Sequence, residues 1–370
     1  MPKKEFKTWD NLPFKTWPYE EQTEMKHKVF GDYFDKWAQI LGKNHPLNYI
    51  DGFGGWGAYH TEKGEIYYGS PVIAAEIIDK FNLGDKCSIL VIDTEKGNIE
   101  NLMKIFAYKK IKCKIQFANS DFDKTINELL DKHENIAPTL FLIDPFGFKI
   151  KYETLKRIMS KNKSEILMNF MYNAVNRFIS LKQNEKIIDE LYGTEKWREI
   201  TSLKEDEREI AIIGLLKTQL KKIASFVFPF RMEFPRMKRT YYYLIHITNH
   251  VKGISIMKSC FAKFNHGRTF YLGLRSGQLT LNEIKEFEFK QEEVKAFLKK
   301  EYQNKYITYL DILKQNMDKI PYLESDIYHA LQKMEEEGVI DIERRPPTTE
   351  KGRKRYSIDN YDVIKFKPLK

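Results

Sequence analysis

Three aspartates in the first 150 residues each end a short apolar run of the kind that forms a buried strand. Asp51 precedes the glycine-rich segment Gly52–Gly57, Asp93 follows Ser88–Ile92, and Asp144 precedes a proline. The carboxyl ends of parallel strands meet along one edge of a sheet, and ligands of such sheets bind at that edge. The spacing therefore predicts a ligand site lined by carboxylates and a glycine loop.

The glycine loop is the most informative of these segments. Its sequence, Tyr49-Ile-Asp-Gly-Phe-Gly-Gly-Trp-Gly57, satisfies GxGxxG directly after a predicted strand. Glycines let a backbone pass close to a ligand where a Cβ would collide, and sites for NAD, FAD and S-adenosyl-L-methionine (SAM) all use the pattern. A nicotinamide or flavin site, or a turn without any ligand, are therefore the alternatives to a SAM site.

Two details favour SAM. Asp51 can accept a hydrogen bond from the positively charged amino group of SAM, whereas the same carboxylate would repel a dinucleotide pyrophosphate. Asp93 stands about 36 residues after Gly57, whereas the acidic residue of a dinucleotide site follows its fingerprint by about 20. The segment 60–69, inserted before Ser70, accounts for the longer spacing.

Further residues are predicted to border the cofactor. Asp93 or Glu95 can accept hydrogen bonds from ribose hydroxyls. Asp121 is a candidate partner of the adenine amine, with Phe122 packing nearby, although Ser120 or Asp121 can equally cap the following helix. From the residues alone, the predicted cofactor-binding set is Asp51, Gly52, Phe53, Gly54, Gly55, Gly57, Asp93, Glu95, Asp121 and Phe122.

The segment Asp144-Pro145-Phe146-Gly147-Phe148 is the catalytic candidate. An enzyme that methylates an amine needs acceptors for two N–H bonds, and an enzyme that acts on a flipped base also needs an aromatic ring on which the base stacks. The Asp144 side chain, a backbone carbonyl held by Pro145, and the ring of Phe146 or Phe148 can supply these groups. The competing interpretation is a strand-to-helix turn with its phenylalanines in the core.

The elements that must position these residues alternate along the chain. An amphipathic helix is predicted over 20–42, with Phe30, Tyr33, Phe34, Trp37 and Ile40 on its apolar face. Apolar strands then alternate with helices, which is typical of a parallel sheet covered on both faces. The predicted strands are 47–51, 88–93, 114–118, 139–144 and 166–170, and the predicted helices are 72–82, 98–109, 121–132 and 151–160.

A helical insertion at about 174–224 precedes two aromatic runs, 226–234 and 241–248. Only a few residues separate the runs, which predicts an antiparallel pair. Pro229 indicates that the first strand lies at an edge or carries a bulge. The predicted fold is therefore α/β, with a Rossmann-like class I methyltransferase sheet that is mostly parallel and has an antiparallel last strand.

A second domain is predicted over 286–370, after a methyltransferase-like domain over 1–285. Helices at 291–302, 308–317 and 325–337, followed by strands at 339–342 and 356–358, predict a winged helix. Its basic loop suits phosphate contacts through Arg344, Arg345, Lys351, Arg353, Lys354 and Arg355. The acidic residues Glu335–Glu337 on the third helix are awkward for entry into a groove, so protein binding or a purely structural role stays open.

The composition of the chain narrows the classes of function that are expected. The formal net charge of +10 suggests a polyanionic partner such as DNA or RNA. Arg177, after the fifth strand, is a candidate phosphate contact or an ordinary surface arginine. The three cysteines are far apart, which argues against a disulfide framework or a zinc site, and no metal ligand set is expected. No apolar run approaches the roughly 18 residues that span a bilayer, and the first residues lack a signal peptide, so a cytoplasmic location without membrane contact is expected.

These motifs together resemble the family of three-Cys-motif partner proteins. The resemblance covers roughly residues 20–265, and it rests on Lys26-His27, the glycine loop, Gly69-Ser-Pro71, Ile143-Asp-Pro-Phe-Gly147 and the strand at 242–248. It implies a radical-SAM-like partner protein, whose cysteines give the family its name. It also adds Ser70, within the Gly-Ser-Pro element, to the expected cofactor-binding set.

More remotely, the same elements are similar to bacterial ribosomal-RNA adenine-N6 methyltransferases. That resemblance implies that Asp144 and Pro145 face a target amine and that Lys26 lies near the SAM site. The chain departs from those enzymes at Phe146, where they have a second proline.

Two functions follow as expectations. The first is a SAM-dependent methyltransferase that acts on a base amine of DNA or RNA. The second is a methyltransferase-like binding module that recruits nucleic acid or a partner protein and transfers little or no methyl group.

Overall fold

The computed structural model describes residues 5–233, 239–264 and 281–368. The chain divides into two compact units, Met1–Gly273 and Leu274–Lys370, and each unit is described by itself. The domain boundary expected from the sequence, between 285 and 286, falls within the helix α10 (Leu281–Tyr302).

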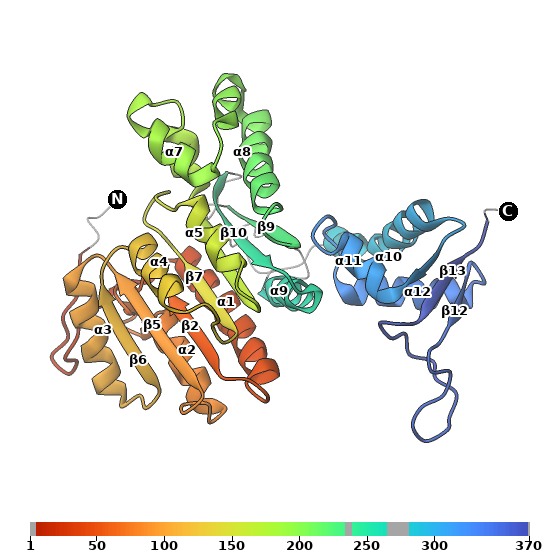
Figure 1. Ribbon diagram of the computed structural model, residues 1–370, viewed down its shortest axis with the longest axis horizontal. Helices are drawn as coiled ribbons and strands as arrows, with labels where there is room; N and C mark the ends of the chain where they lie inside the picture. Colours follow the sequence, from red (N-terminus) through yellow and green to blue (C-terminus); the bar gives the residue numbers. More distant parts are fainter. Residues whose placement is uncertain (1–4, 234–238, 265–280, 369–370) are drawn as a thin grey trace. The chain divides into compact units, whose positions relative to one another are not determined.

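The larger unit contains, within the described residues, a seven-stranded sheet in the order β6-β5-β2-β7-β8-β10-β9 (Figure 1). Strands β6 to β8 of this order run parallel, and β10 is antiparallel to both of its neighbours. The sheet confirms the predicted α/β fold with an antiparallel last strand. Its strands are β2 (Leu47–Asp51), β5 (Cys87–Asp93), β6 (Lys114–Asn119), β7 (Thr139–Ile143), β8 (Ser164–Phe170), β9 (Phe226–Glu233) and β10 (Thr240–Thr248).

Pro229 lies on β9, which forms one edge of the sheet, as its missing N–H predicted. The predicted strand 226–234 ends at Glu233, because Phe234 and most of the connection to β10 lie outside the described residues.

Helices cover both faces of the sheet. On one face, α1 (Glu21–Leu41) packs against α2 (Ser70–Lys80) and α9 (Val251–Phe264), while α3 (Lys96–Lys109) packs on β5 and β6. On the other face, α4 (Phe122–Lys132) packs against α5 (Tyr152–Met159). The central strands β7 and β8 are largely apolar and are buried at every position, because both of their faces are covered.

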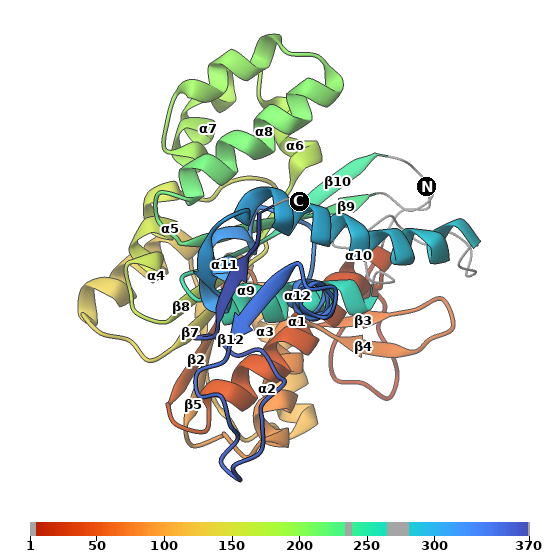
Figure 2. The same ribbon diagram turned by 90° about the vertical axis from the view of Figure 1, so that its right-hand side faces the viewer.

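The helical insertion stands at one end of the larger unit, where Figures 1 and 2 both show α7 and α8 beyond the sheet. It comprises α6 (Tyr172–Phe178), α7 (Glu185–Tyr192), α8 (Glu205–Leu220) and 3-10 turns at Lys182–Asn184 and Lys196–Ser202.

The predicted first helix is confirmed, and so is most of its apolar face. Phe30, Tyr33, Phe34 and Trp37 are buried. Ile40 is 48% exposed, so its predicted burial is wrong; it lies in the last turn of the helix. None of the helices in the described ranges is both long and apolar enough to cross a membrane. The three cysteines are free, buried thiols.

A small second sheet forms around the segment predicted as an insertion. It has the order β1-β3-β4, with β1 (Trp17–Pro18), β3 (Ala58–His60) and β4 (Ile66–Tyr68). Figure 2 shows the β3–β4 hairpin extending away from the main sheet. The hairpin starts directly after the glycine loop, so the N-terminal segment, the loop and residues 58–68 are tied together.

The smaller unit combines helices with an antiparallel sheet of order β11-β13-β12, among the residues described. Its elements are α10, β11 (Tyr306–Thr308), α11 (Tyr309–Asn316), α12 (Glu324–Glu336), β12 (Ile340–Glu343) and β13 (Val363–Phe366). The predicted strand at 356–358 is wrong, because Ile364 and Phe366 supply the buried face while Tyr356 is 68% exposed. The winged-helix assignment stays a prediction.

Candidate functional site

Asp51 ends β2 and is fully buried, with no exposed surface. Its oxygens accept hydrogen bonds from the Tyr49 hydroxyl at 2.7 Å, the Ser70 hydroxyl at 2.6 Å and the Phe53 N–H at 3.3 Å. Burial raises the pKa of Asp51 to about 6, although the hydrogen bonds from Ser70 and Tyr49 act in the opposite direction. In this structure Asp51 and Ser70 therefore anchor the loop from below, and their predicted contact with a ligand stays a prediction.

Asp93 ends the neighbouring strand β5 and holds the same loop from the side. One oxygen accepts from the Gly55 N–H at 2.8 Å and the Asn98 amide at 3.0 Å, and the other accepts from the Glu95 N–H at 2.8 Å. Asp93 is buried, whereas Glu95 is exposed at the same edge. Of the two predicted ribose partners, Glu95 is the one whose carboxylate is open to solvent.

The motif glycines are required by packing within the protein. A Cβ on Gly54 would lie 2.4 Å from a valine methyl of β5, and one on Gly57 would lie 2.3 Å from a leucine methyl of α3. A Cβ on Gly52 would lie 2.6 Å from the Phe122 ring. We expected these glycines to make room for a ligand, and at these three positions the atoms in the way belong to the protein. Gly55, at φ +59°, has no such neighbour closer than 3.9 Å, so the loop is open on its side.

Asp121 caps α4, because its side chain accepts the Lys124 N–H at 2.9 Å. Its N-cap role is therefore confirmed, and its predicted adenine contact is untested. Phe122 is buried, with its ring centre 5.5 Å from that of Phe53. The two rings thus connect the glycine loop to the start of α4.

Asp144 follows β7 directly and forms an ion pair with Lys26 of α1. The side chains of Lys26 and Asp144 are 12% and 25% exposed. The Asn169 amide, at the end of β8, donates to the other Asp144 oxygen at 2.6 Å. Burial alone would raise the pKa of Asp144, but Lys26 and Asn169 outweigh it and lower the pKa. Asp144 is therefore an ionised acceptor at neutral pH.

Asn169 is a site residue that the sequence left without a role, although its position at a strand end on this edge was visible. The ionised Asp144 can only accept, so the amide nitrogen of Asn169 must face it. The Asn169 carbonyl oxygen then points elsewhere; it is buried and has no hydrogen-bond partner among the residues that the structure describes. Such an oxygen costs about 1–3 kcal/mol unless a donor reaches it, so this one is ready to accept an N–H.

The residues after Asp144 separate into packing and exposed positions. Pro145 is buried, and Phe148 is partly buried against the apolar core. Phe146 is fully exposed, at 109% of its reference surface. Of the two candidate aromatic platforms, Phe148 has a packing role, and Phe146, two residues after Asp144, has a solvent-exposed ring.

His27 follows Lys26 and lies beneath two tyrosines. Its Nδ1 is 3.3 Å from the Tyr19 hydroxyl, and its ring centre is 5.3 Å from that of Tyr59. Burial lowers the pKa of His27 to about 3, with Lys26 acting in the same direction, so the imidazole is neutral at physiological pH. Tyr19 and Tyr59 are site neighbours that the sequence analysis missed, because the small sheet that contains Tyr59 and that Tyr19 directly follows was not predicted.

Three of the seven predicted basic phosphate contacts form ion pairs within the smaller unit. Arg344 forms a bidentate pair with Glu335 at 2.7 Å to each oxygen. Arg345 pairs with Glu343, and Arg355 is buried against Asp362. In this structure these arginines pair with carboxylates of the same unit, and their predicted phosphate contact stays a prediction.

The other predicted basic contacts are open. Lys351, Arg353 and Lys354 are exposed, and none forms an ion pair with a described residue. Arg177 is exposed on α6, with its guanidinium 5.9 Å from the Phe178 ring centre. These four side chains are therefore the predicted phosphate contacts that form no ion pair with a described residue.

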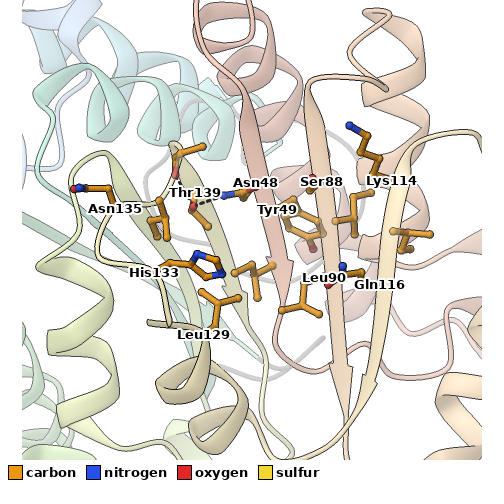
Figure 3. A pocket seen from close by; sticks show the side chains of 15 residues that line it. Asn48, Tyr49, Ser88, Leu90, Lys114, Gln116, Leu129, His133, Asn135 and Thr139 are labelled. Carbon is orange, nitrogen blue, oxygen red and sulfur yellow. Dashed lines mark hydrogen bonds between the residues drawn. The ribbon is translucent and has the colours of Figure 1, made fainter. Parts of the chain in front are cut away.

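A cavity of about 620 Å³ lies at the opposite ends of the strands that carry the glycine loop and Asp144 (Figure 3). Asn48, Ser88, Lys114 and Thr139, at or near the starts of β2, β5, β6 and β7, line it together with His133. It is separate from the carboxyl edge where Asp51, Asp93 and Asp144 meet. No motif in the sequence predicted this cavity.

Comparison with known proteins finds likeness only at the level of solved structures. No protein-family model and no curated protein sequence matches the chain. Protein LPL1258 of Legionella pneumophila, of the family model DUF519, is 15% identical, with a TM-score of 0.45, over 66% of this chain and 91% of that one.

Two methyltransferases are also similar. A SAM-dependent methyltransferase of Agrobacterium tumefaciens is 9% identical, with a TM-score of 0.38, over 68% of this chain and 71% of that one. Human methyltransferase-like protein 13, solved with SAH, is 10% identical, with a TM-score of 0.35, over 71% of this chain and 99% of that one. At these values the likeness does not extend to function, and the family resemblance stays a prediction.

Proposed function

We propose that the larger unit binds SAM and transfers its methyl group to an amine of a nucleic-acid base. The supporting observation is the pair formed by the Asp144 carboxylate and the Asn169 carbonyl oxygen. Both are hydrogen-bond acceptors, they lie at the ends of adjacent strands, and the Asn169 oxygen lacks a donor. An exocyclic amine offers two N–H donors, which is the complementary pattern.

The chain's residues fit SAM on the edge next to this pair. Gly55 provides an open turn of backbone, Glu95 an exposed carboxylate for ribose hydroxyls, and Asp121 an exposed carboxylate beyond β6. SAM supplies a methyl group bonded to a positively charged sulfur. In the transfer, the lone pair of the acceptor nitrogen forms the new N–C bond while the C–S bond breaks with its electrons going to sulfur. Asp144 is placed to accept the proton that the nitrogen loses.

A nucleic-acid substrate is supported by the exposed Phe146 ring and by the basic side chains. A solvent-exposed ring beside an amine-binding carboxylate suits stacking of an extruded base. The open side chains Lys351, Arg353 and Lys354 suit phosphate contacts that orient a substrate without reading sequence. A radical-SAM-like partner protein is part of this proposal through the family resemblance alone.

One observation favours the second function, a binding module without transfer. In this structure Asp51 and Asp144 both use their oxygens within the protein: Asp51 accepts three hydrogen bonds, and Asp144 is paired with Lys26. A protein that only binds SAM or nucleic acid could keep both carboxylates in such pairs permanently. Methyl transfer requires that the Lys26 ammonium group move away from Asp144 when the substrate amine binds.

Methyl transfer from labelled SAM to DNA, RNA and protein by the full chain tests the proposal. We expect label in a nucleic acid and its loss in Asp144→Ala, with SAM binding retained. Phe146→Ala should also lose transfer to nucleic acid, whereas Phe178→Ala, at a partly exposed ring on α6, should not. Tight SAM binding without label in any acceptor would favour the binding module. Failure to bind SAM would refute the methyltransferase and would leave a module that binds nucleic acid or a partner protein.

A further inference from the structure

Tyr59 of β3 lies against the open side of the glycine loop. A Cβ on Gly55 would lie 3.9 Å from its hydroxyl oxygen, and one on Gly69 would lie 3.4 Å from its ring. The Tyr19 ring centre is 5.4 Å from that of Tyr59, and the His27 ring packs edge-on from α1. These contacts fix the ring between α1 and the loop, with its hydroxyl directed at Gly55.

The Tyr59 hydroxyl has no hydrogen-bond partner among the described residues, and three carboxylates of the same sheet edge act on it electrostatically. Burial is the largest influence that raises the pKa of Tyr59, and Asp144, Asp51 and Asp93 raise it further. One of these carboxylates, Asp144, is paired with the ammonium group of Lys26, whereas the oxygens of Asp51 and Asp93 accept hydrogen bonds from neutral groups. A site with this excess of negative charge suits a cation.

We propose that the Tyr59 hydroxyl oxygen contacts the positively charged sulfur centre of bound SAM and makes the site prefer SAM over its demethylated product, S-adenosylhomocysteine. This inference rests on the proposed function. The sulfonium is the one charge that the transfer removes from the ligand, because the product sulfur is neutral. A contact with that charge holds the substrate and is lost in the product, so it favours exchange of product for substrate. The alternative is that Tyr59 only packs the small sheet against the loop.

Calorimetric titration of the full chain with SAM and with S-adenosylhomocysteine tests this role. Tyr59→Phe keeps the ring and removes the oxygen, which is the negative end of the O–H dipole that would face the sulfonium. We therefore expect SAM to bind about tenfold more weakly. Binding of S-adenosylhomocysteine should change much less. Tyr67→Phe, at the cross-strand neighbour of Tyr59 on β4, is the matched control and should leave both affinities unchanged.

Each outcome decides. If Tyr59→Phe weakens both ligands equally, the hydroxyl contacts a part that they share, and the proposal is overturned while the SAM site stands. The proposal also fails if neither affinity changes. If the unmodified chain binds neither ligand, the SAM site itself is refuted and this inference with it. Thermal unfolding of each variant in the absence of ligand separates loss of contact from loss of fold.

Discussion

The ion pair between Lys26 and Asp144 makes a quantitative prediction for Lys26→Met. Removing one partner of a buried ion pair costs about 3–5 kcal/mol, because the remaining charge is left without compensation. Asp144 is 25% exposed and keeps the hydrogen bond from Asn169, so solvent and that amide offset part of the cost. We therefore expect the free energy of unfolding at pH 7 to fall by about 2 kcal/mol, which is less than the cost for a fully buried pair.

The pH dependence gives the prediction its sign. Lys26 helps to lower the pKa of Asp144 in the folded state, so the pair stabilises the fold above the unfolded pKa of about 4. That contribution is lost as the pH falls through the lowered value. The difference in stability between the unmodified chain and Lys26→Met should therefore shrink below about pH 4.

Urea unfolding from pH 3 to pH 7 measures both quantities. Lys28→Met is the control, because Lys28 lies on the same helix and pairs with Glu24 at the surface. Its cost should stay below about 0.5 kcal/mol. The reasoning is refuted if Lys26→Met costs no more than Lys28→Met at pH 7, or if its effect is as large at pH 3 as at pH 7.

Three further predictions use unfolding or binding measurements. Burial raises the pKa of Asp51 to about 6, so the free energy of unfolding should fall as the pH rises from about 4 to 6, by up to about 1.4 kcal/mol per pH unit. In Asp51→Asn the urea midpoint should no longer depend on pH in this range. An unchanged pH dependence would contradict the assignment. Gly57→Ala should lower the free energy of unfolding in urea by at least about 2 kcal/mol, because the new Cβ would lie 2.3 Å from a leucine methyl. Gly214→Ala, in α8 with open space around it, should raise it by about 0.5–1 kcal/mol. Similar effects at both positions would contradict the packing account. Arg355→Met should lower the free energy of unfolding by about 3 kcal/mol because its buried partner loses its charge compensation, whereas Lys351→Met should change it very little. Lys351→Met alone should weaken binding to an oligonucleotide and reduce the slope of log affinity against log salt concentration by about one. Equal thermal shifts in the two variants would overturn this division.

The strands of the main sheet could be predicted from the sequence because the signals for them lie within each segment. Apolar runs such as Leu47–Asp51 and Thr139–Ile143 are long enough to identify a buried strand without knowledge of its neighbours. The glycine loop and Asp144 follow such runs directly, so their meeting at one edge followed from the rule for parallel strands. Pro229 placed β9 at the sheet edge for the same reason: a missing N–H excludes a central position whatever the rest of the fold does.

Side chains at the site were harder to assign, because their roles depend on partners distant in sequence. The sequence shows that Arg355 is basic, but not that Asp362 buries and neutralises it. It shows the glycines of the loop, but not that methyl groups from β5 and α3 occupy the space where their Cβ atoms would lie. Each outcome is set by contacts between elements, which no local pattern encodes.

The sequence by itself determined the order of strands and helices and the edge at which the carboxylates gather, since periodicity and turn chemistry are properties of neighbouring residues. Only the tertiary structure decided which of those carboxylates are engaged: Asp51 by Ser70, and Asp144 by Lys26. It alone left the Asn169 oxygen and the Tyr59 hydroxyl without partners within the described residues. The physical reason is that a hydrogen bond or an ion pair acts over a few ångströms, and folding chooses which side chains come that close.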